Sequence, residues 1–112
     1  MYRHVFRSGQ DPARHPTVIL IHGLGGTLNI WDPIASVLEH RFSVLRYDLR
    51  GHGQSDVPAG DWSLEDFVGD LEAIFIDESL PHAHLVGFSL GGLIVQQFAL
   101  SYPERVGQLA IL

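Results

Sequence analysis

The chain contains no cysteine among its 112 residues. Disulfide bonds, thiolate catalysis and cysteine-based zinc sites are therefore excluded. Basic residues are also scarce, because seven Lys and Arg stand against 13 Asp and Glu and give a formal net charge of −6. Nucleic acids and anionic membranes attract basic surfaces, so we expect neither as a partner.

Long apolar runs are missing as well. No segment approaches the roughly 20 apolar residues that cross a bilayer, and residues 1–7 lack the apolar stretch of a secretory signal. We therefore expect a cytoplasmic protein. The 46% of hydrophobic residues can supply one core, which predicts a single domain over residues 1–112.

Short apolar, β-branched runs alternate with segments of helical periodicity. These runs predict strands at 17–21, 42–47, 83–88 and 106–112, with a further strand near 2–7. Strands that alternate with helices predict an α/β fold with a mostly parallel sheet and helices on both faces.

The first predicted helix starts with a proline. Asp32 is expected to be its N-cap and Pro33 its first helical residue. Its apolar face is predicted to consist of Ile34, Val37 and Leu38.

Two further helices are predicted. One begins at a capping box of Ser63 and Asp66, and the other spans 90–101 and ends before Pro103. The apolar residues of the first of these recur at helical spacing: Leu64, Phe67, Val68, Leu71, Ile74 and Phe75. Trp31 and Trp62 are expected to pack in the core.

Three loops follow three predicted strands and carry the chemistry. The first loop covers residues 22–26 (HGLGG), the second loop covers 48–55 (DLRGHGQS), and the third covers 87–91 (GFSLG). In an open α/β sheet, ligands bind at the carboxyl ends of the strands. A glycine-rich loop in that place can aim backbone N–H groups at a developing oxyanion.

The third loop has the G-x-S-x-G pattern of a nucleophile elbow. Such an elbow holds its serine on a sharp, strained turn, with the hydroxyl above the edge of the sheet. Gly87 and Gly91 are expected where strand and helix pack too closely for side chains. Ser89 is therefore the candidate catalytic residue.

Taken together, the three loops resemble those of the α/β-hydrolase fold, over about residues 18–112. Residues 42–60 are similar to those of the 3-oxoadipate enol-lactonases and their esterase relatives. The resemblance implies hydrolysis of a small-molecule carboxylic ester or lactone, without a metal or other cofactor. It also implies Ser89 as the nucleophile and the N–H groups of Leu24 and Leu90 as the oxyanion hole.

The resemblance gives the other loop residues supporting roles. His22 would brace the first loop, to which Gly23 also belongs, and the second loop would be structural, with Arg50 holding loops together. Asp48 and Arg50 are expected to form a buried structural pair. For His22 and His52 we expect local hydrogen bonds, and neither stands where the base of this fold would be.

The order of the triad in this fold places an acid and then a histidine after the serine. Here all seven histidines precede Ser89, and Glu104 is the only acidic residue after it. We therefore expect the N-terminal part of a hydrolase, an incomplete domain that ends within a buried strand at 106–112. Alone it is expected to be nearly inactive and to self-associate through its open sheet edge.

Two other interpretations remain open. A non-catalytic remnant or domain of the same fold would not react with a fluorophosphonate probe, which needs an activated serine. A dinucleotide-binding domain is less favoured. Residues 23–28 and Asp48 mimic its fingerprint, but Leu28 stands at the third glycine position. Within the hydrolase fold, C–C bond hydrolysis and perhydrolase-like chemistry would use the same elbow.

Overall fold

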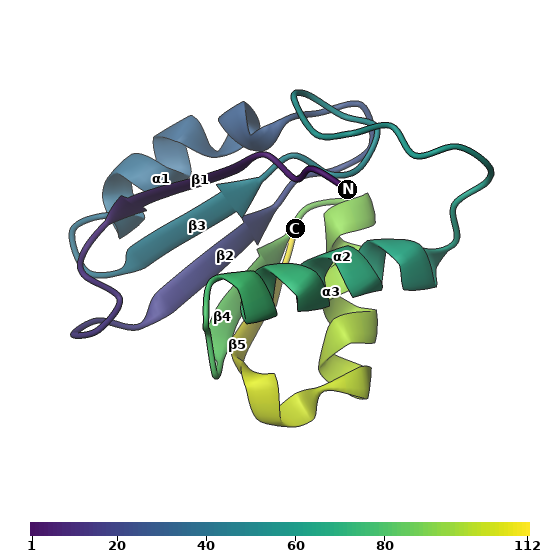
Figure 1. Cartoon of the computed structure of the whole chain (residues 1–112). Helices are drawn as coiled ribbons and strands as arrows, with labels where there is room; N and C mark the ends of the chain where they lie inside the picture. Colours follow the sequence, from purple (N-terminus) through teal and green to yellow (C-terminus); the bar gives the residue numbers. More distant parts are fainter.

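The computed structural model covers residues 1–112 and is built around one five-stranded sheet of order β1-β3-β2-β4-β5 (Figure 1). β1 pairs antiparallel with β3, and all other neighbours are parallel. The prediction of a mostly parallel sheet is confirmed, and the extra N-terminal strand is its antiparallel member. The strands are β1 Val5–Gly9, β2 Thr17–Ile21, β3 Ser43–Tyr47, β4 Ala83–Gly87 and β5 Val106–Ile111.

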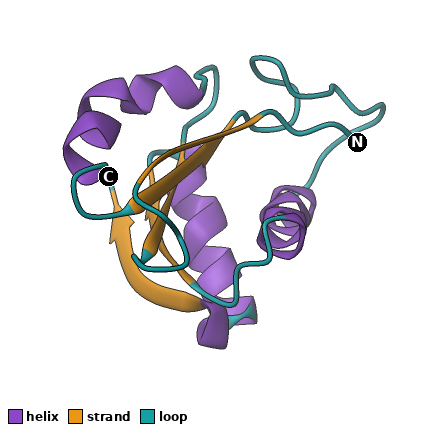
Figure 2. Cartoon of the chain, turned by 60° about the vertical axis from the view of Figure 1, so that its left-hand side comes forward, coloured by secondary structure: helices purple, strands orange, loops and turns teal.

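Helices lie on both faces of the sheet, as predicted (Figure 2). α1 covers one face, while α2 and α3 cover the other. Two 3-10 helices, η1 and η2, precede α1 and β5, and no helix is long and apolar enough to cross a bilayer. The bounds are η1 Leu28–Trp31, α1 Asp32–Leu38, α2 Leu64–Asp77, α3 Leu90–Ser101 and η2 Pro103–Arg105.

The core is divided by the sheet into two apolar clusters. Ile19 and Ile21 of β2 belong to a cluster of 15 residues shared with α2 and α3, whereas Val18 and Leu20 belong to one of five residues shared with α1. Successive side chains of a strand point to opposite faces. A strand buried on both faces therefore reads as the continuous apolar run seen at residues 17–21.

The start of α1 differs from the prediction. Thr27 caps η1 by accepting a hydrogen bond from Asn29 N–H at 3.3 Å, and η1 continues directly into α1. Asp32 is therefore already helical, with φ −48° and ψ −49°, and the N-cap is Trp31. Pro33 occupies the second helical position and not the first.

The predicted apolar face of α1 is correct for Leu38 but wrong for Ile34 and Val37. Ile34 and Val37 are 41% and 68% exposed. The buried row consists of Trp31 and Ala35, with Leu38 packed against it. This row has the spacing i, i+4, i+7 and starts inside η1, so the unpredicted 3-10 turn sets which side of the helix faces the sheet.

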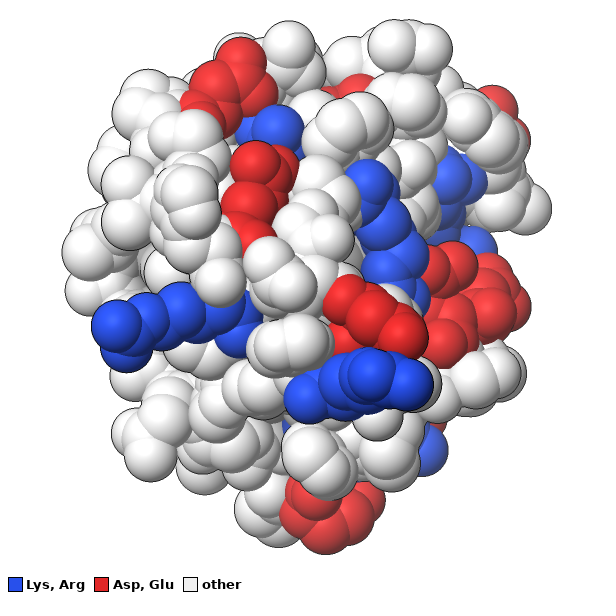
Figure 3. Space-filling model, turned by 90° about the vertical axis from the view of Figure 1, so that its left-hand side faces the viewer, with Lys and Arg blue, Asp and Glu red and all other residues white.

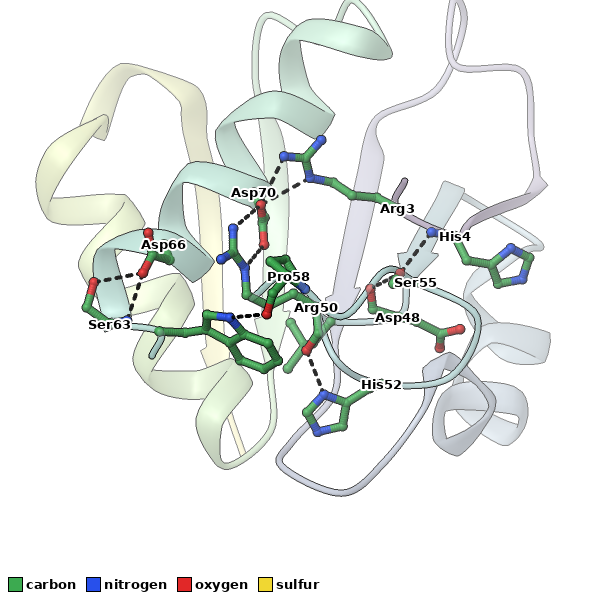
Figure 4. Close-up of polar contacts among 12 residues, drawn as sticks. Arg3, His4, Asp48, Arg50, His52, Ser55, Pro58, Ser63, Asp66 and Asp70 are labelled. Carbon is green, nitrogen blue, oxygen red and sulfur yellow. Dashed lines mark hydrogen bonds and ion pairs between the residues drawn. The ribbon is translucent and has the colours of Figure 1, made fainter. Parts of the chain in front are cut away.

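The predicted start of α2 is confirmed. Ser63 and Asp66 form the capping box, and Ser63 N–H donates to the Asp66 carboxylate at 2.8 Å (Figure 4). Phe67, Leu71 and Phe75 lie on the buried face, as the spacing predicts.

The strand register places the three loops side by side. Ile21 pairs with Tyr47 on one side and with Gly87 on the other, so β2, β3 and β4 end in one row. The first loop therefore lies between the second loop and the elbow at one edge of the sheet.

β5 is an outer strand, and the prediction that it is buried is wrong. Leu109 is 38% exposed and Ile111 49%. β5 pairs with β4 alone, and an apolar hollow of about 370 Å³ separates it from Leu38 and Phe42. Self-association through this edge stays a prediction, which size-exclusion chromatography with light scattering would check.

Most basic side chains are paired with acidic ones. Ion pairs engage five of the seven basic residues, among them Arg7 with Glu78 and Arg46 with Asp32. On the face shown in Figure 3, blue and red side chains accordingly lie beside one another and form no single-sign area.

Candidate active site

Ser89 lies on the turn between β4 and α3 in a conformation that L-residues rarely adopt. Its φ is +56° and its ψ −118°, and Ser79 is the only other non-glycine residue with positive φ. Backbone hydrogen bonds hold the turn on both sides, from Phe88 N–H to Ile21 O at 3.0 Å and from Ser89 N–H to Leu112 O at 3.3 Å. The prediction of a strained strand-to-helix turn is confirmed, and Ser89 is exposed.

Two glycines let the elbow close. A Cβ at Gly87 would overlap the carbonyl oxygen of Gly91, and a Cβ at Gly91 would overlap the carbonyl oxygen of Ile21. The backbones of β4, α3 and β2 are thus in direct contact beneath Ser89, which is the close packing that the sequence predicts.

The first loop adjoins the elbow. A Cβ at Gly23 would lie 2.9 Å from Ser89 Cβ and 3.0 Å from Phe88 O. The next residue, Leu24, donates its N–H to no group of the protein. Leu90 is the first residue of α3, where an amide has no partner within the helix. Two amides next to Ser89 are therefore free to bind a ligand.

His22 is fully buried and joins the first loop to the second. Leu49 N–H donates to Nε2 at 2.9 Å, so Nδ1 carries the proton and donates to Gly23 O at 2.7 Å. Burial lowers the pKa of His22, and the hydrogen bond to Gly23 opposes that shift. The imidazole is therefore neutral, with both nitrogens engaged.

Asp48 connects the second loop to η1. Its Oδ1 accepts Leu28 N–H at 2.8 Å and its Oδ2 accepts Gln54 N–H at 2.9 Å. Gly53 has φ +51°, and a Cβ there would overlap the Asp48 carboxylate. This buried carboxylate therefore holds Leu28, two residues beyond the first loop.

Arg50 binds Asp70 of α2, so the predicted pair of Asp48 with Arg50 is wrong. Its guanidinium donates to the Asp70 carboxylate at 2.6 and 2.9 Å, which raises the pKa of Arg50 (Figure 4). Arg3 binds the same carboxylate at 2.9 Å. Asp48 faces the first loop while Arg50 faces α2, which is why the two do not meet. Arg50 nevertheless ties the second loop to a helix, at 5.8 Å from the Trp62 ring.

His52 makes a contact that sequence reasoning missed. Gly25 N–H donates to His52 Nε2 at 2.9 Å, and His52 Nδ1 donates to Arg50 O at 2.9 Å. The expectation of local hydrogen bonds is therefore incomplete for both His52 and His22, because each ring also binds a backbone amide of the neighbouring loop. These partners follow from β3 lying beside β2, which no local pattern specifies.

The geometry gives the dinucleotide interpretation no support. Both carboxylate oxygens of Asp48 already accept backbone amides, so they are not free for a ribose. Leu28 is buried at the third glycine position. No group of three or more His, Asp or Glu side chains is placed to hold a metal ion.

The succession of strands, loops and elbow matches a known protein family. A family model described as alpha/beta hydrolase fold matches residues 16–112. The chain belongs to this family. Membership in the alpha/beta hydrolase family fits the close contact between the first loop and the serine elbow.

Individual members of the alpha/beta hydrolase family show the same likeness. An uncharacterized protein of Mycobacterium tuberculosis is 36% identical over 111 residues, which are 98% of this chain and 31% of that protein. A hydrolase from Pseudomonas aeruginosa is 37% identical with a TM-score of 0.89, over 94% of this chain and 39% of that one. The enol-lactonase from Burkholderia xenovorans is 32% identical with a TM-score of 0.92, over 96% and 41%. The chain spans less than half the length of each.

Proposed function

We propose that this chain supplies the nucleophile and the oxyanion-binding amides of a serine hydrolase for carboxylic esters or lactones. Ser89 Oγ attacks the carbonyl carbon, and Leu24 N–H and Leu90 N–H donate to the oxygen that becomes negative. Collapse of the tetrahedral intermediate expels the alkoxide, which takes up a proton, and water then hydrolyses the acyl-enzyme.

One observation carries this proposal. Ser89 is an exposed, non-glycine residue with φ +56° at a strand-to-helix junction. Such strain persists only where the surroundings impose it, and it concentrates at functional sites. Here Gly87 and Gly91 impose it, and Gly23 brings the first loop against the strained residue.

An apolar hollow beside the elbow supports an ester or lactone with an apolar part. It measures about 310 Å³ and lies between the elbow and α1. The B. xenovorans relative is named an enol-lactonase, which supports the lactone class. The lining residues are Ile30, Trp31, Ile34, Phe88 and Leu112.

The proton of Ser89 needs an acceptor that neither loop histidine provides. Both ring nitrogens of His22 and of His52 already make hydrogen bonds. We propose that the acid and the histidine of the triad belong to the part of the whole protein that corresponds to the remainder of its longer relatives. The chain alone is therefore expected to hydrolyse p-nitrophenyl acetate at a near-background rate.

The test is a chimaera in which residues 1–112 replace the matching part of the B. xenovorans enol-lactonase. It is expected to hydrolyse lactones and to react with a fluorophosphonate. Ser89→Ala is expected to abolish labelling and to lower kcat by about 10⁶, whereas Ser101→Ala, at the exposed end of α3, is the matched control.

The outcomes separate the interpretations. A folded chimaera that is not labelled at Ser89 would favour the non-catalytic remnant. Hydrolysis that survives Ser89→Ala would contradict the assignment of the nucleophile. Ordinary esterase turnover by the isolated chain, abolished by Ser89→Ala, would show that a histidine before Ser89 is the base.

A further inference from the structure

We propose that His52 is a positioning residue that fixes the Leu24 N–H for its part in the oxyanion hole. The inference rests on the function proposed above, because that function gives the Leu24 N–H its task. The observation behind it is the 2.9 Å hydrogen bond from Gly25 N–H to His52 Nε2, which crosses from the first loop to the second.

Leu24 lies between two peptide groups, and each is held by a different histidine. The peptide group between Gly23 and Leu24 includes the Leu24 N–H, and its carbonyl oxygen accepts His22 Nδ1–H at 2.7 Å. The next peptide group joins Leu24 to Gly25, and its N–H donates to His52. A peptide group is planar. The two histidines therefore fix the planes on both sides of the Leu24 Cα.

Packing cannot replace the hydrogen bond of His52. Gly25 has φ +81°, and a Cβ there would meet no heavy atom within 4 Å. The side chain of Leu24 is 77% exposed and anchors nothing. A backbone hydrogen bond from Gly26 N–H to Gly23 O at 3.1 Å closes the turn, and within this turn His52 is the acceptor that holds the Gly25 N–H.

His52 is itself held in place from α2. Its Nδ1–H donates to Arg50 O at 2.9 Å, and the Arg50 guanidinium makes two hydrogen bonds to Asp70 (Figure 4). The His52 ring also meets the His22 ring edge-on at 5.2 Å. A chain of fixed groups thus leads from Asp70 to Gly25, which gives the His52 ring one orientation.

The hydrogen bond from Gly25 N–H requires the tautomer of His52 in which Nδ1 carries the proton and Nε2 does not. A backbone N–H can only donate, so Nε2 must keep its lone pair. Removal of this acceptor is therefore expected to release the Leu24 amide without unfolding the sheet.

The first test is nuclear magnetic resonance of the 112-residue chain and of the chimaera. A scalar coupling between the Gly25 amide nitrogen and His52 Nε2 is expected in both. His82→Gln, at an exposed histidine without a hydrogen bond, should keep this coupling. A folded protein without it would overturn the proposal.

The second test separates positioning from general support. His52→Gln places an amide oxygen near the position of Nε2, whereas His52→Phe keeps a ring but offers no acceptor. In the chimaera, His52→Phe is expected to lower kcat about tenfold with little change in KM, less than the ~10²–10³ lost with an oxyanion donor. Gly25 amide exchange should become about fivefold faster.

His52→Gln is expected to restore kcat, because its amide oxygen again accepts the Gly25 N–H. Equal losses in both variants would show a merely structural role and contradict the proposal. Failure of the proposed function is recognised separately, because Ser89→Ala would then leave hydrolysis intact whatever the coupling between Gly25 and His52 shows.

Discussion

The two loops that meet at Ser89 are held by different forces. The elbow makes no side-chain hydrogen bond at its cap, and it is fixed by glycines whose Cα atoms abut the backbone of neighbouring elements. The first loop has open space around Gly25. It is fixed by hydrogen bonds to the rings of His22 and His52 and, two residues beyond its end, by the bond from Leu28 N–H to Asp48.

The elbow and the first loop are therefore disrupted by different kinds of change. The steric contacts of the elbow do not depend on pH, but one added methyl group would disrupt them because the backbone atoms cannot move aside. The hydrogen bonds of the first loop tolerate added side-chain volume, but they are lost when an acceptor is removed or protonated. The nucleophile is thus held rigidly, whereas the first loop is held partly by His22, whose pKa is lowered by burial.

A substitution in the elbow should have the largest effect on the free energy of unfolding. In Gly91→Ala, the new Cβ would overlap the Ile21 carbonyl oxygen, and we expect a loss of about 3 kcal/mol or more in the free energy of unfolding. Urea denaturation measures this. Gly69→Ala is the matched control, because Gly69 lies in α2 with nothing within 4 Å of an added Cβ. It should be neutral or stabilising by about 0.5–1 kcal/mol.

A Gly91→Ala variant as stable as the parent chain would show that β2 and α3 can separate. Steric contact would then not fix the elbow, and the contrast between the two loops would disappear.

Removal of the Asp48 carboxylate, which accepts two backbone amides, should have the second-largest effect on the free energy of unfolding. Asp48→Ala leaves the amides of Leu28 and Gln54 without partners, at a cost of about 2–3 kcal/mol. Asp48→Asn keeps one acceptor oxygen and should lose less. Asp61→Ala, at an exposed residue of the following loop, is the control. If Asp48→Ala and Asp61→Ala melt alike in urea, the carboxylate does not hold the start of η1.

The sequence could predict what depends on local patterns. β2 and α3 have the predicted bounds because apolar runs, glycines and Pro103 mark their ends. The elbow was recognised from five consecutive residues, since its strain is created by glycines two positions from Ser89.

The sequence could not predict contacts that depend on the order of strands. β3 lies beside β2, and this neighbourhood alone brings Asp48 to Leu28 and His52 to Gly25. The wrong partner for Arg50 has the same origin, because Asp70 lies on a helix that folds across the sheet. The missed η1 shifted the buried face of α1 for a simpler reason, since a short turn has no periodicity to detect.

The third prediction compares glycines of the two loops. Gly25→Ala forces a side chain into φ +81° but meets no atoms, so we expect a cost of about 1 kcal/mol from strain alone. Gly60→Ala is matched, with φ +87° and equally open space. Thermal or urea melts should rank both variants well above Gly91→Ala in stability. A Gly25→Ala variant as damaged as Gly91→Ala would mean that the first loop is also packed sterically.

The smallest effect should be the pH dependence that His22 gives to the first loop. Burial lowers the pKa of His22 from 6.5, although its hydrogen bond to Gly23 opposes the shift. The unfolded chain then binds the proton more readily. Stability is full above about pH 6.5 and is lost as the pH falls toward the lower folded value.

Urea melts at about pH 7.5 and about pH 5.5 measure this loss, in a window above the range where most carboxylates titrate. His22→Leu should be less stable at both values and should lack part of the parent chain's loss on acidification. Gly91→Ala should keep that loss in full, because no titrating group holds the elbow. If His22→Leu showed the same pH dependence as the parent chain, His22 would not be the group through which acid loosens the first loop.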